Sequence, residues 1–336
     1  MGVYCNVVSS ELAYRFADAA ILSAVPLPEL TRLDVRWPTA DTYSVDCLPS
    51  TPSLRSGRPS ATVRPTTGRM TLGLEKTSQG MMLRFPSLAV FALTGDLRRV
   101  AVQAEPGVNQ ETVRHLLLDQ VLPRLLAHHG RLIVHGAAVE IDGRAIVFVG
   151  DTGAGKSTLA ASFSSDGYRL LCDDGLLLTA DALRSVALPT YQSLRLWPDS
   201  VTGVFTGSRP RTAPMAHYST KQRVLIDDVT APNNEPLPTA ALYVLSSNAD
   251  TDTTAIARLS PRDGCMAVIR NAFQLDVTDP ERAAGLMAKA GDVSQRVPVF
   301  ALSTPRCFSA LTAVRAAVLD HQGQWATSDD EPKEGR

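Results

Sequence analysis

The chain has few cysteines, no excess charge of either sign and no long apolar run, and each absence excludes a class of protein. Five cysteines, scattered and odd in number among 336 residues, predict neither a disulfide framework nor a cysteine-based zinc site. The 33 basic and 34 acidic residues nearly cancel, so the overall charge gives no sign of a nucleic-acid partner. No apolar run approaches about 18 residues, and no basic segment precedes an apolar core at the N-terminus, so we expect neither a membrane span nor a signal peptide. A protein of the reducing cytoplasm fits these absences best.

The length and composition predict two domains and a tail. With 44% hydrophobic residues, the chain can bury a large core. Residues 1–105 carry short strand patterns, one helical piece near the start and no chemical motif, which predicts a smaller β-rich domain. Asn109 is expected to cap a helix that Pro123 kinks or ends, within a second domain over residues 106–320. Residues 321–336 are polar and are expected to be disordered.

One stretch carries a strong chemical signal. It satisfies G-x-x-x-x-G-K-[ST] at every fixed position and stands between a strand pattern and a helix pattern. Its glycines let backbone N–H groups turn inward around phosphate oxygens, its lysine can reach the β and γ phosphates, and its serine hydroxyl can ligate Mg²⁺. We therefore predict a nucleotide site with ATP and Mg²⁺ as cofactors; the alternative is a glycine-rich turn that binds nothing. The predicted nucleotide-binding residues are Gly150, Asp151, Thr152, Gly153, Ala154, Gly155, Lys156, Ser157 and Thr158.

A β-hairpin is predicted immediately before this stretch. Two β patterns, over residues 131–140 and 144–149, are joined at Asp142-Gly143, a favoured two-residue hairpin turn. The strand that feeds the phosphate loop therefore pairs antiparallel with its predecessor, whereas ordinary P-loop proteins begin a parallel series there. This pairing would bring His135 near the nucleotide.

Two adjacent carboxylates, Asp173 and Asp174, follow a strand pattern that ends at Cys172. Near Mg²⁺ and a triphosphate, such a pair can divide the work: one carboxylate holds the metal and the other accepts a proton from an attacking hydroxyl. The spacing alone does not decide which aspartate does which. The alternative is an acidic turn at the end of a strand.

Three arginines further along are candidate substrate contacts. Arg195 lies between two leucines, where a cation could hold an anionic substrate group or a phosphate oxygen, or where a solvated arginine could stand on an ordinary strand. Arg209 and Arg211 belong to a segment rich in Gly, Pro and Thr. Such a segment could be a mobile lid or peptide-binding loop, or an idle surface loop.

Three of these segments together resemble the catalytic core of the HPr kinase/phosphorylase family, in the same order and at the same spacing. They are His135–Gly143, Gly150–Ser157 and Leu171–Asp174. The resemblance implies an α/β P-loop fold with a mixed sheet, shared with the nucleotide-binding half of phosphoenolpyruvate carboxykinase. The wider pattern, which includes Gln120–Pro123, is more similar to the stand-alone kinases of ribosomal peptide pathways, notably the lasso-peptide serine kinases.

The resemblance also implies roles for individual residues. Asp173 matches the carboxylate that takes the proton from the acceptor serine, and His135 matches a histidine that lines the site. Asp174 and Ser157 match residues that support the metal. Lys156 matches the lysine that contacts the transferred phosphate.

The function implied is an ATP- and Mg²⁺-dependent kinase that phosphorylates a serine-type hydroxyl of a peptide or small protein. The leading substrate is a lasso-type precursor with a C-terminal serine; the alternatives are an HPr-like protein or a small metabolite. A nucleotide-binding switch with little catalysis is an alternative of another class. Arg195 stands where the bifunctional enzymes carry a glutamate, which puts the reverse phosphorolysis in doubt. The oligomeric state, a homo-oligomer included, the choice between ATP and GTP, and the role of residues 1–105 stay open.

Overall fold

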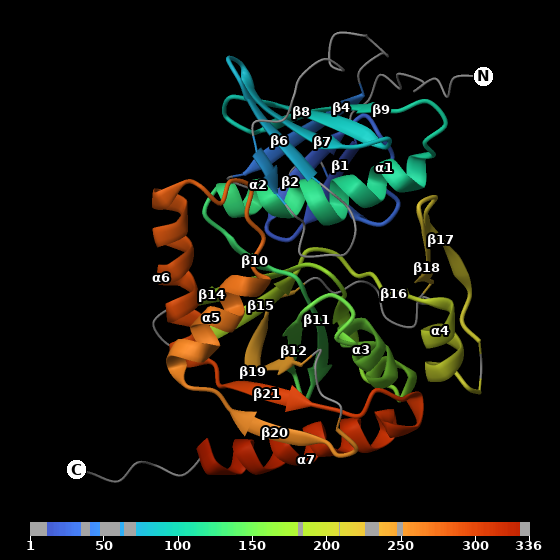
Figure 1. Ribbon diagram of the computed structural model, residues 1–336, viewed down its shortest axis with the longest axis vertical. Helices are drawn as coiled ribbons and strands as arrows, with labels where there is room; N and C mark the ends of the chain where they lie inside the picture. The colour runs from blue at the N-terminus through green and yellow to red at the C-terminus, as the bar shows by residue number, and fades with distance from the viewer. Residues whose placement is uncertain are drawn as a thin grey trace.

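The protein is an assembly of two large sheets with helices between and around them, as the computed structural model in Figure 1 shows. The structure describes residues 12–34, 41–47, 61–63, 72–180, 184–207, 209–225, 235–246 and 251–329. Within these residues there are two nine-stranded sheets and one three-stranded sheet. The mixed α/β class predicted from the sequence is confirmed, and within the same residues no helix is both long and apolar enough to span a bilayer.

The first sheet is built entirely from the N-terminal part of the chain, in the order β3-β1-β2-β4-β9-β8-β7-β6-β5. Most neighbours are antiparallel, but β4 runs parallel to both β2 and β9. The prediction of a helical piece near the start is wrong, because residues 12–16 form strand β1. Tyr14 and Phe16 alternate inward along this strand, and both are buried in the core. The strands are β1 (Leu12–Phe16), β2 (Ala19–Ser23), β3 (Thr31–Arg32), β4 (Thr42–Cys47), β5 (Ala61–Val63), β6 (Leu72–Thr77), β7 (Gly80–Phe85), β8 (Ala89–Thr94) and β9 (Arg99–Ala104).

A long helix lies under this sheet and separates it from the second sheet (Figure 1). It consists of α1 (Gln110–Leu116), a π-helical turn η2 (Leu117–Val121) and α2 (Leu122–His128). Asn109 caps it as predicted, since its side-chain oxygen accepts from the Thr112 N–H at 3.0 Å. Pro123 does not end the helix: the wider π turn directly before it accommodates the missing N–H. The apolar side of the helix shares one core with the first sheet, and the predicted division after residue 105 stays a prediction.

The second sheet carries the phosphate loop. Its main path is β10-β14-β15-β19-β12-β11-β13, with β21 beside β19 and β20 beside β21. The β11–β12 hairpin is confirmed, with Asp142 and Gly143 at φ values of 51° and 73°, as a type I′ turn requires. On its other side β12 runs parallel to β19, which runs parallel to β21. The strands are β10 (Leu132–Val134), β11 (Gly136–Ile141), β12 (Arg144–Gly150), β13 (Leu170–Cys172), β14 (Leu176–Ala180), β15 (Ser185–Pro189), β19 (Leu237–Leu245), β20 (Ala255–Arg258) and β21 (Val299–Ser303).

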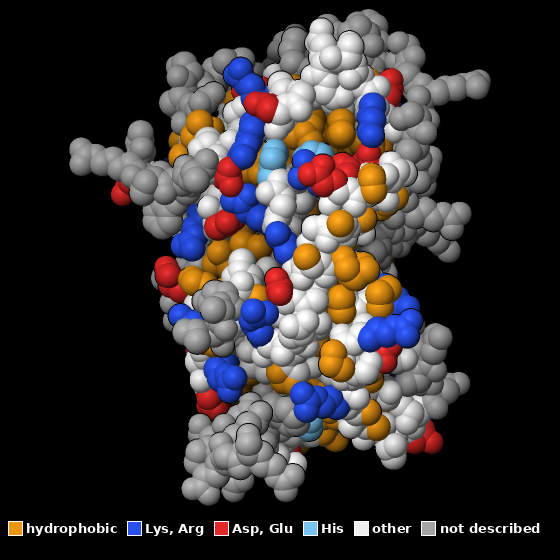
Figure 2. Space-filling model, turned by 90° about the vertical axis from the view of Figure 1, so that its left-hand side faces the viewer, with side chains coloured by type: hydrophobic (Ala, Val, Ile, Leu, Met, Phe, Trp, Pro, Cys, Tyr) orange, Lys and Arg blue, Asp and Glu red, His pale blue; other side chains and the backbone are white. Residues whose placement is uncertain are grey.

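Helices cover both faces of this sheet because its central strands are apolar on both sides. Phe148 and Tyr243 face one helical layer, and Val147 and Leu242 face the other. The first layer contains α3 (Lys156–Ser165), α4 (Pro198–Val204) and α7 (Leu311–Asp329). The second contains α5 (Pro261–Asn271) and α6 (Pro280–Arg296). On the face that carries α6, basic and acidic side chains are interspersed (Figure 2).

The end of α7 corrects the prediction of a disordered tail. Residues 321–329 are helical, and residues 330–336 lie outside the described part of the chain. The polar composition gave a wrong prediction because two side chains of this segment, His321 and Gln322, contact Tyr243 of the sheet. His321 Nδ1 lies 2.7 Å from the Tyr243 hydroxyl, which also accepts from Gln322 at 2.7 Å.

Candidate active site

The predicted nucleotide-binding residues form one continuous loop and the first turn of α3. Gly150, Gly153 and Gly155 have φ values of 142°, 81° and 98°, which only glycine adopts readily. A Cβ on Gly150 would also lie 2.5 Å from the Leu245 carbonyl oxygen, so the loop can follow β12 only with glycine there. Lys156 is buried, and its ammonium donates to the carbonyl oxygens of Gly150 and Asp151 at 2.8 and 3.1 Å. The loop thus curls around its own lysine, as a phosphate cradle does.

The two aspartates face this loop from the end of β13. Asp173 Oδ1 accepts from the Ser157 hydroxyl at 2.8 Å, and its Oδ2 accepts from the backbone N–H of Arg195 at 3.1 Å. The next residue, Asp174, has a left-handed backbone with φ at 78°, and its Oδ1 accepts from His135 Nε2 at 2.9 Å. The structure therefore brings together the three segments that the sequence singles out: the hairpin histidine, the phosphate loop and the acid pair.

The surroundings of the two carboxylates shift their pKa values in opposite directions. Burial, together with the charge of Asp174, raises the pKa of Asp173 to about 7. Burial would also raise the pKa of Asp174, but the Arg195 charge and the His135 hydrogen bond outweigh it and hold the pKa well below its usual range. Burial lowers the pKa of His135 in turn, so the imidazole donates to Asp174 as a neutral group. Two titrating groups whose pKa values are pushed apart are typical of acid–base sites.

Arg195 has a place that neither reading of the sequence predicts. It lies in β16 (Arg195–Leu196) and is only 1% exposed, so it is neither solvated nor open to an acceptor. Its guanidinium contacts both carboxylate oxygens of Asp119, with Nη2 2.7 Å from Oδ1. Its Nη1, which contacts Asp119 Oδ2, also lies 3.1 Å from Asp174 Oδ2. Arg195 therefore links the π turn of the long helix to the acid pair.

Asp119 is the residue of this network that the sequence analysis misses. It stands in η2 and is almost completely buried. Its carboxylate also accepts from the Tyr191 hydroxyl and lies 2.6 Å from His115 Nδ1. A charged residue between Leu118 and Val121, in a largely apolar run of sequence, was the available signal, since a buried carboxylate needs a partner.

Asn271 is a second residue without a sequence signal. It is the last residue of α5, and its side-chain oxygen accepts from the Gly150 N–H at 3.0 Å. Its own carbonyl accepts from the His135 N–H at 2.7 Å. One asparagine thus holds both the start of the phosphate loop and the backbone beside the imidazole.

A third missed group borders the acid pair on the three-stranded sheet, which contains β16, β17 (Thr212–Ala216) and β18 (Ser219–Val224). The Lys221 charge opposes the rise in the pKa of Asp173 and helps to lower the pKa of Asp174. Its ammonium also lies 5.5 Å from the centre of the Trp197 ring, and Trp197 and Tyr218 are both exposed. These side chains form what we call the aromatic rim: Trp197, Tyr218 and Lys221.

The other two predicted substrate arginines lie next to this sheet. Arg209 and Arg211 are exposed and directly precede β17. The Arg211 carbonyl accepts from the Leu225 N–H at 2.8 Å, which fixes the backbone of that segment at the sheet. Their contact with a substrate stays a prediction.

The oxygen donors at the acid pair fit Mg²⁺. Ser157 and the two aspartates supply one hydroxyl and two carboxylates, and Mg²⁺ is commonly held by one or two carboxylates together with a ligand's phosphates. A cation there would also compensate the burial of Asp173, whose pKa is raised. Of the predicted metal ligands, Ser157 contacts Asp173, while Asp174 contacts His135 and Arg195. Within the described residues, no cluster of three or more His, Cys, Asp or Glu side chains is arranged to hold a metal by itself.

The likeness of this chain to known proteins lies in structure rather than in sequence. No protein-family model and no curated protein matches the sequence. Among solved structures, the HPr(Ser) kinase/phosphatase from Coxiella burnetii matches with 10% identity, over 58% of this chain and 98% of its own. The TM-score is 0.30, which is too low to support a conclusion about this chain. The function is therefore judged on the geometry of the site.

Proposed function

We propose that this protein is an ATP- and Mg²⁺-dependent kinase that transfers the γ-phosphoryl group to a hydroxyl acceptor. One observation carries the proposal: Asp173, whose pKa is raised to about 7, is hydrogen-bonded to the serine that follows the lysine of the phosphate loop. A carboxylate with a pKa near neutrality is suited to accept a proton at physiological pH. Its position next to the loop supports a role at the terminal phosphate of a bound nucleotide.

The residues of the chain divide the chemistry between them. The loop N–H groups and the N-terminus of α3 hold the phosphates, and Lys156 exchanges its two carbonyl partners for a stronger anionic one. Asp173 takes the proton from the acceptor hydroxyl, while Asp174 stays ionised under His135 and Arg195. When bound, Mg²⁺ neutralises charge that develops on the phosphate oxygens. Because the phosphoryl transition state is loose, positioning and charge are most of what the protein must supply.

We further propose that the acceptor is a serine of a peptide or small protein. The aromatic rim supports this class, since exposed aromatic side chains beside a catalytic base are suited to hold a peptide rather than a small polar metabolite. Within this class, a lasso-type precursor with a C-terminal serine is the leading candidate from the sequence resemblance, and an HPr-like protein is the alternative.

The test is phosphoryl transfer from γ-labelled ATP with Mg²⁺ to a panel of serine peptides and small proteins. Wild type is compared with Asp173→Asn and with Asp292→Asn, which removes an exposed carboxylate of α6. We expect label on a serine with wild type and Asp292→Asn, and a loss of about 10²-fold or more with Asp173→Asn. Transfer that survives Asp173→Asn would remove Asp173 as the base. Bound ATP without transfer to any acceptor would favour the nucleotide-binding switch.

A further inference from the structure

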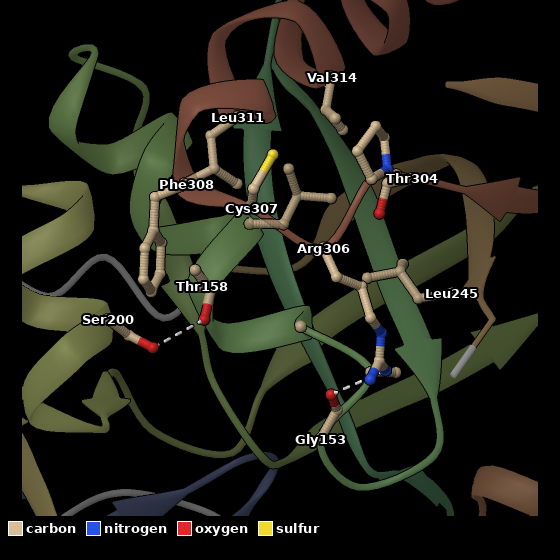
Figure 3. A pocket seen from close by; sticks show the side chains of 14 residues that line it. Gly153, Thr158, Ser200, Leu245, Thr304, Arg306, Cys307, Phe308, Leu311 and Val314 are labelled. Carbon is tan, nitrogen blue, oxygen red and sulfur yellow. Dashed lines mark hydrogen bonds between the residues drawn. The ribbon is translucent and has the colours of Figure 1, made fainter. Parts of the chain in front are cut away.

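A hollow of about 220 Å³ opens on the side of the phosphate loop away from the acid pair. Figure 3 shows its walls: the loop and α3, the end of β19, the segment that follows β21, and the start of α7. This segment, residues 304–308, leads into a short 3₁₀ turn, η3 (Phe308–Ala310). Its lining includes Ser200, Arg306, Cys307, Phe308 and Leu311.

The hollow has apolar walls and a polar edge. Leu245, Leu311 and Val314 supply the apolar side chains. The Phe308 ring is 39% exposed, and it packs directly against Gly203 of α4, where an added Cβ would lie 2.3 Å from the ring. An aromatic ring fixed from behind and open in front is a stacking surface.

The polar edge is tied to the phosphate loop itself. The Arg306 guanidinium donates to the Gly153 carbonyl at 3.3 Å, and the Thr158 hydroxyl donates to Ser200 at 3.3 Å (Figure 3). Arg306 is exposed, so its planar guanidinium is available to a ligand as well. A molecule with one end in the loop could therefore reach this edge with its other end.

The two sides of α3 give the bound molecule a direction. Ser157 turns to Asp173 on one side, and the next residue, Thr158, lines the hollow on the other. Phosphates that end at the acid pair consequently leave the opposite end of the ligand at the hollow. At about 220 Å³ the hollow is smaller than the ~300–1,000 Å³ of pockets that enclose a whole drug-sized ligand, so it suits one ring system.

We propose that this hollow binds the base and ribose of the nucleoside triphosphate, with the base against Phe308 and Arg306. The proposal rests on the nucleotide site of the proposed function and adds which part of the chain recognises the nucleoside. It makes residues 304–314, which carry no nucleotide-binding motif, the determinants of affinity for the base.

Cys307 provides the direct test because its thiol is exposed and lines the hollow. Its alkylation by iodoacetamide is followed by peptide mass spectrometry with Mg²⁺ and either ATP or inorganic tripolyphosphate. ATP at about ten times its Kd should slow the reaction of Cys307 about tenfold, while tripolyphosphate leaves it unchanged. Cys265, partly exposed on α5 at the other face of the sheet, is the internal control and should react at one rate throughout.

The outcomes separate this proposal from the proposed function. If calorimetry shows that both ligands bind but ATP does not protect Cys307, the base lies elsewhere and the kinase proposal survives. Equal protection by tripolyphosphate would likewise overturn the assignment of the hollow to the nucleoside. If neither ligand binds, the phosphate loop holds no nucleotide and both proposals fall together.

A variant pair checks the stacking surface independently. Phe308→Ala should weaken ATP binding at least about fivefold, the lower end of what base stacking contributes, and leave tripolyphosphate affinity unchanged. Met287→Ala, which removes another exposed apolar side chain on α6, should change neither affinity. Unaltered ATP affinity in Phe308→Ala, with tripolyphosphate binding intact, would refute a role for the ring.

Discussion

The two sides of the phosphate loop are built on opposite principles. On the acid side, Asp173, Asp174, His135 and Arg195 are buried or nearly so and are held by direct hydrogen bonds and ion pairs. On the other side, the hollow is open, its walls are largely apolar, and its arginine and phenylalanine are exposed. This difference fits the two proposed roles, since proton transfer needs charges fixed in place, whereas recognition of a flat base needs a surface. Changes on the acid side should therefore alter the rate of transfer, and changes at the hollow should alter affinity.

The largest effect is expected from Asp119→Ala, which leaves Arg195 buried without its main partner. Removing one member of a buried ion pair costs about 3–5 kcal/mol of stability, so thermal or urea unfolding should shift strongly. The double variant Asp119→Leu with Arg195→Met replaces the whole pair by apolar side chains and should recover most of that stability. It should not recover transfer, because Asp174 has lost its cation. Full activity in the stable double variant would show that the network only supports the fold.

Lys156→Met tests the loop that the two sides share. Methionine keeps most of the length of the side chain and loses the charge that would face the transferred phosphate, so kcat should fall by about 10²–10³. Rates are measured at saturating ATP to separate this loss from weaker binding. Arg144→Met, which removes an exposed cation at the far end of β12, is the matched control and should leave kcat unchanged. A normal kcat in Lys156→Met would contradict the proposal that the loop holds the transferred phosphate.

The pH dependence of kcat/KM tests the acid side separately from the hollow. A base must be ionised to work, and the pKa of Asp173 is raised to about 7 by burial and by the charge of Asp174. The value of kcat/KM should therefore rise about tenfold per pH unit below pH 7 and level off above it. Phe308→Ala, altered only at the hollow, should keep the same inflection. A profile that is flat between about pH 5.5 and 8 would contradict the role of Asp173.

The smallest effect is a gain in stability from Asp173→Asn. The pKa of Asp173 is higher in the folded state than its ordinary value of 3.8, so the folded protein holds the extra proton, and stability is lost as pH rises through about 7. Asparagine carries no such charge, so the variant should melt at least about 2 °C above wild type at pH 8. At pH 4 the variant and wild type should melt at the same temperature. Asp292→Asn should show no gain at either pH. A lower melting temperature for Asp173→Asn at pH 8 would mean that the carboxylate stabilises the fold.

The parts of the site that the sequence predicts are those that short stretches of chain encode. The hairpin turn at Asp142-Gly143 and the glycines of the phosphate loop need special backbone angles, and the residue types reveal them. Strand alternation likewise predicts the four strands β6 to β9 of the first sheet. It fails at β1, where a five-residue pattern is too short to distinguish a strand from a helix before its neighbours are known.

The parts that the sequence does not predict depend on contacts between distant residues. Arg195 and Asp119 are 76 residues apart, and Asn271 is 121 residues from Gly150. No local pattern records such a pairing, although a charge in a largely apolar run of sequence is a hint that a partner exists. The hollow beside residues 304–308 has the same cause, since it exists only where α3, α4 and α7 meet.

The most direct test of the central claim is the titration of Asp173 itself. Protein labelled with ¹³C at aspartate carboxyl carbons is followed by NMR across pH, and the Asp173→Asn variant identifies the resonance. We expect this carboxyl to titrate at about 7, while that of Asp174 stays ionised to low pH. Titration of Asp173 below about 5, as in an ordinary aspartate, would contradict its assignment as the proton acceptor.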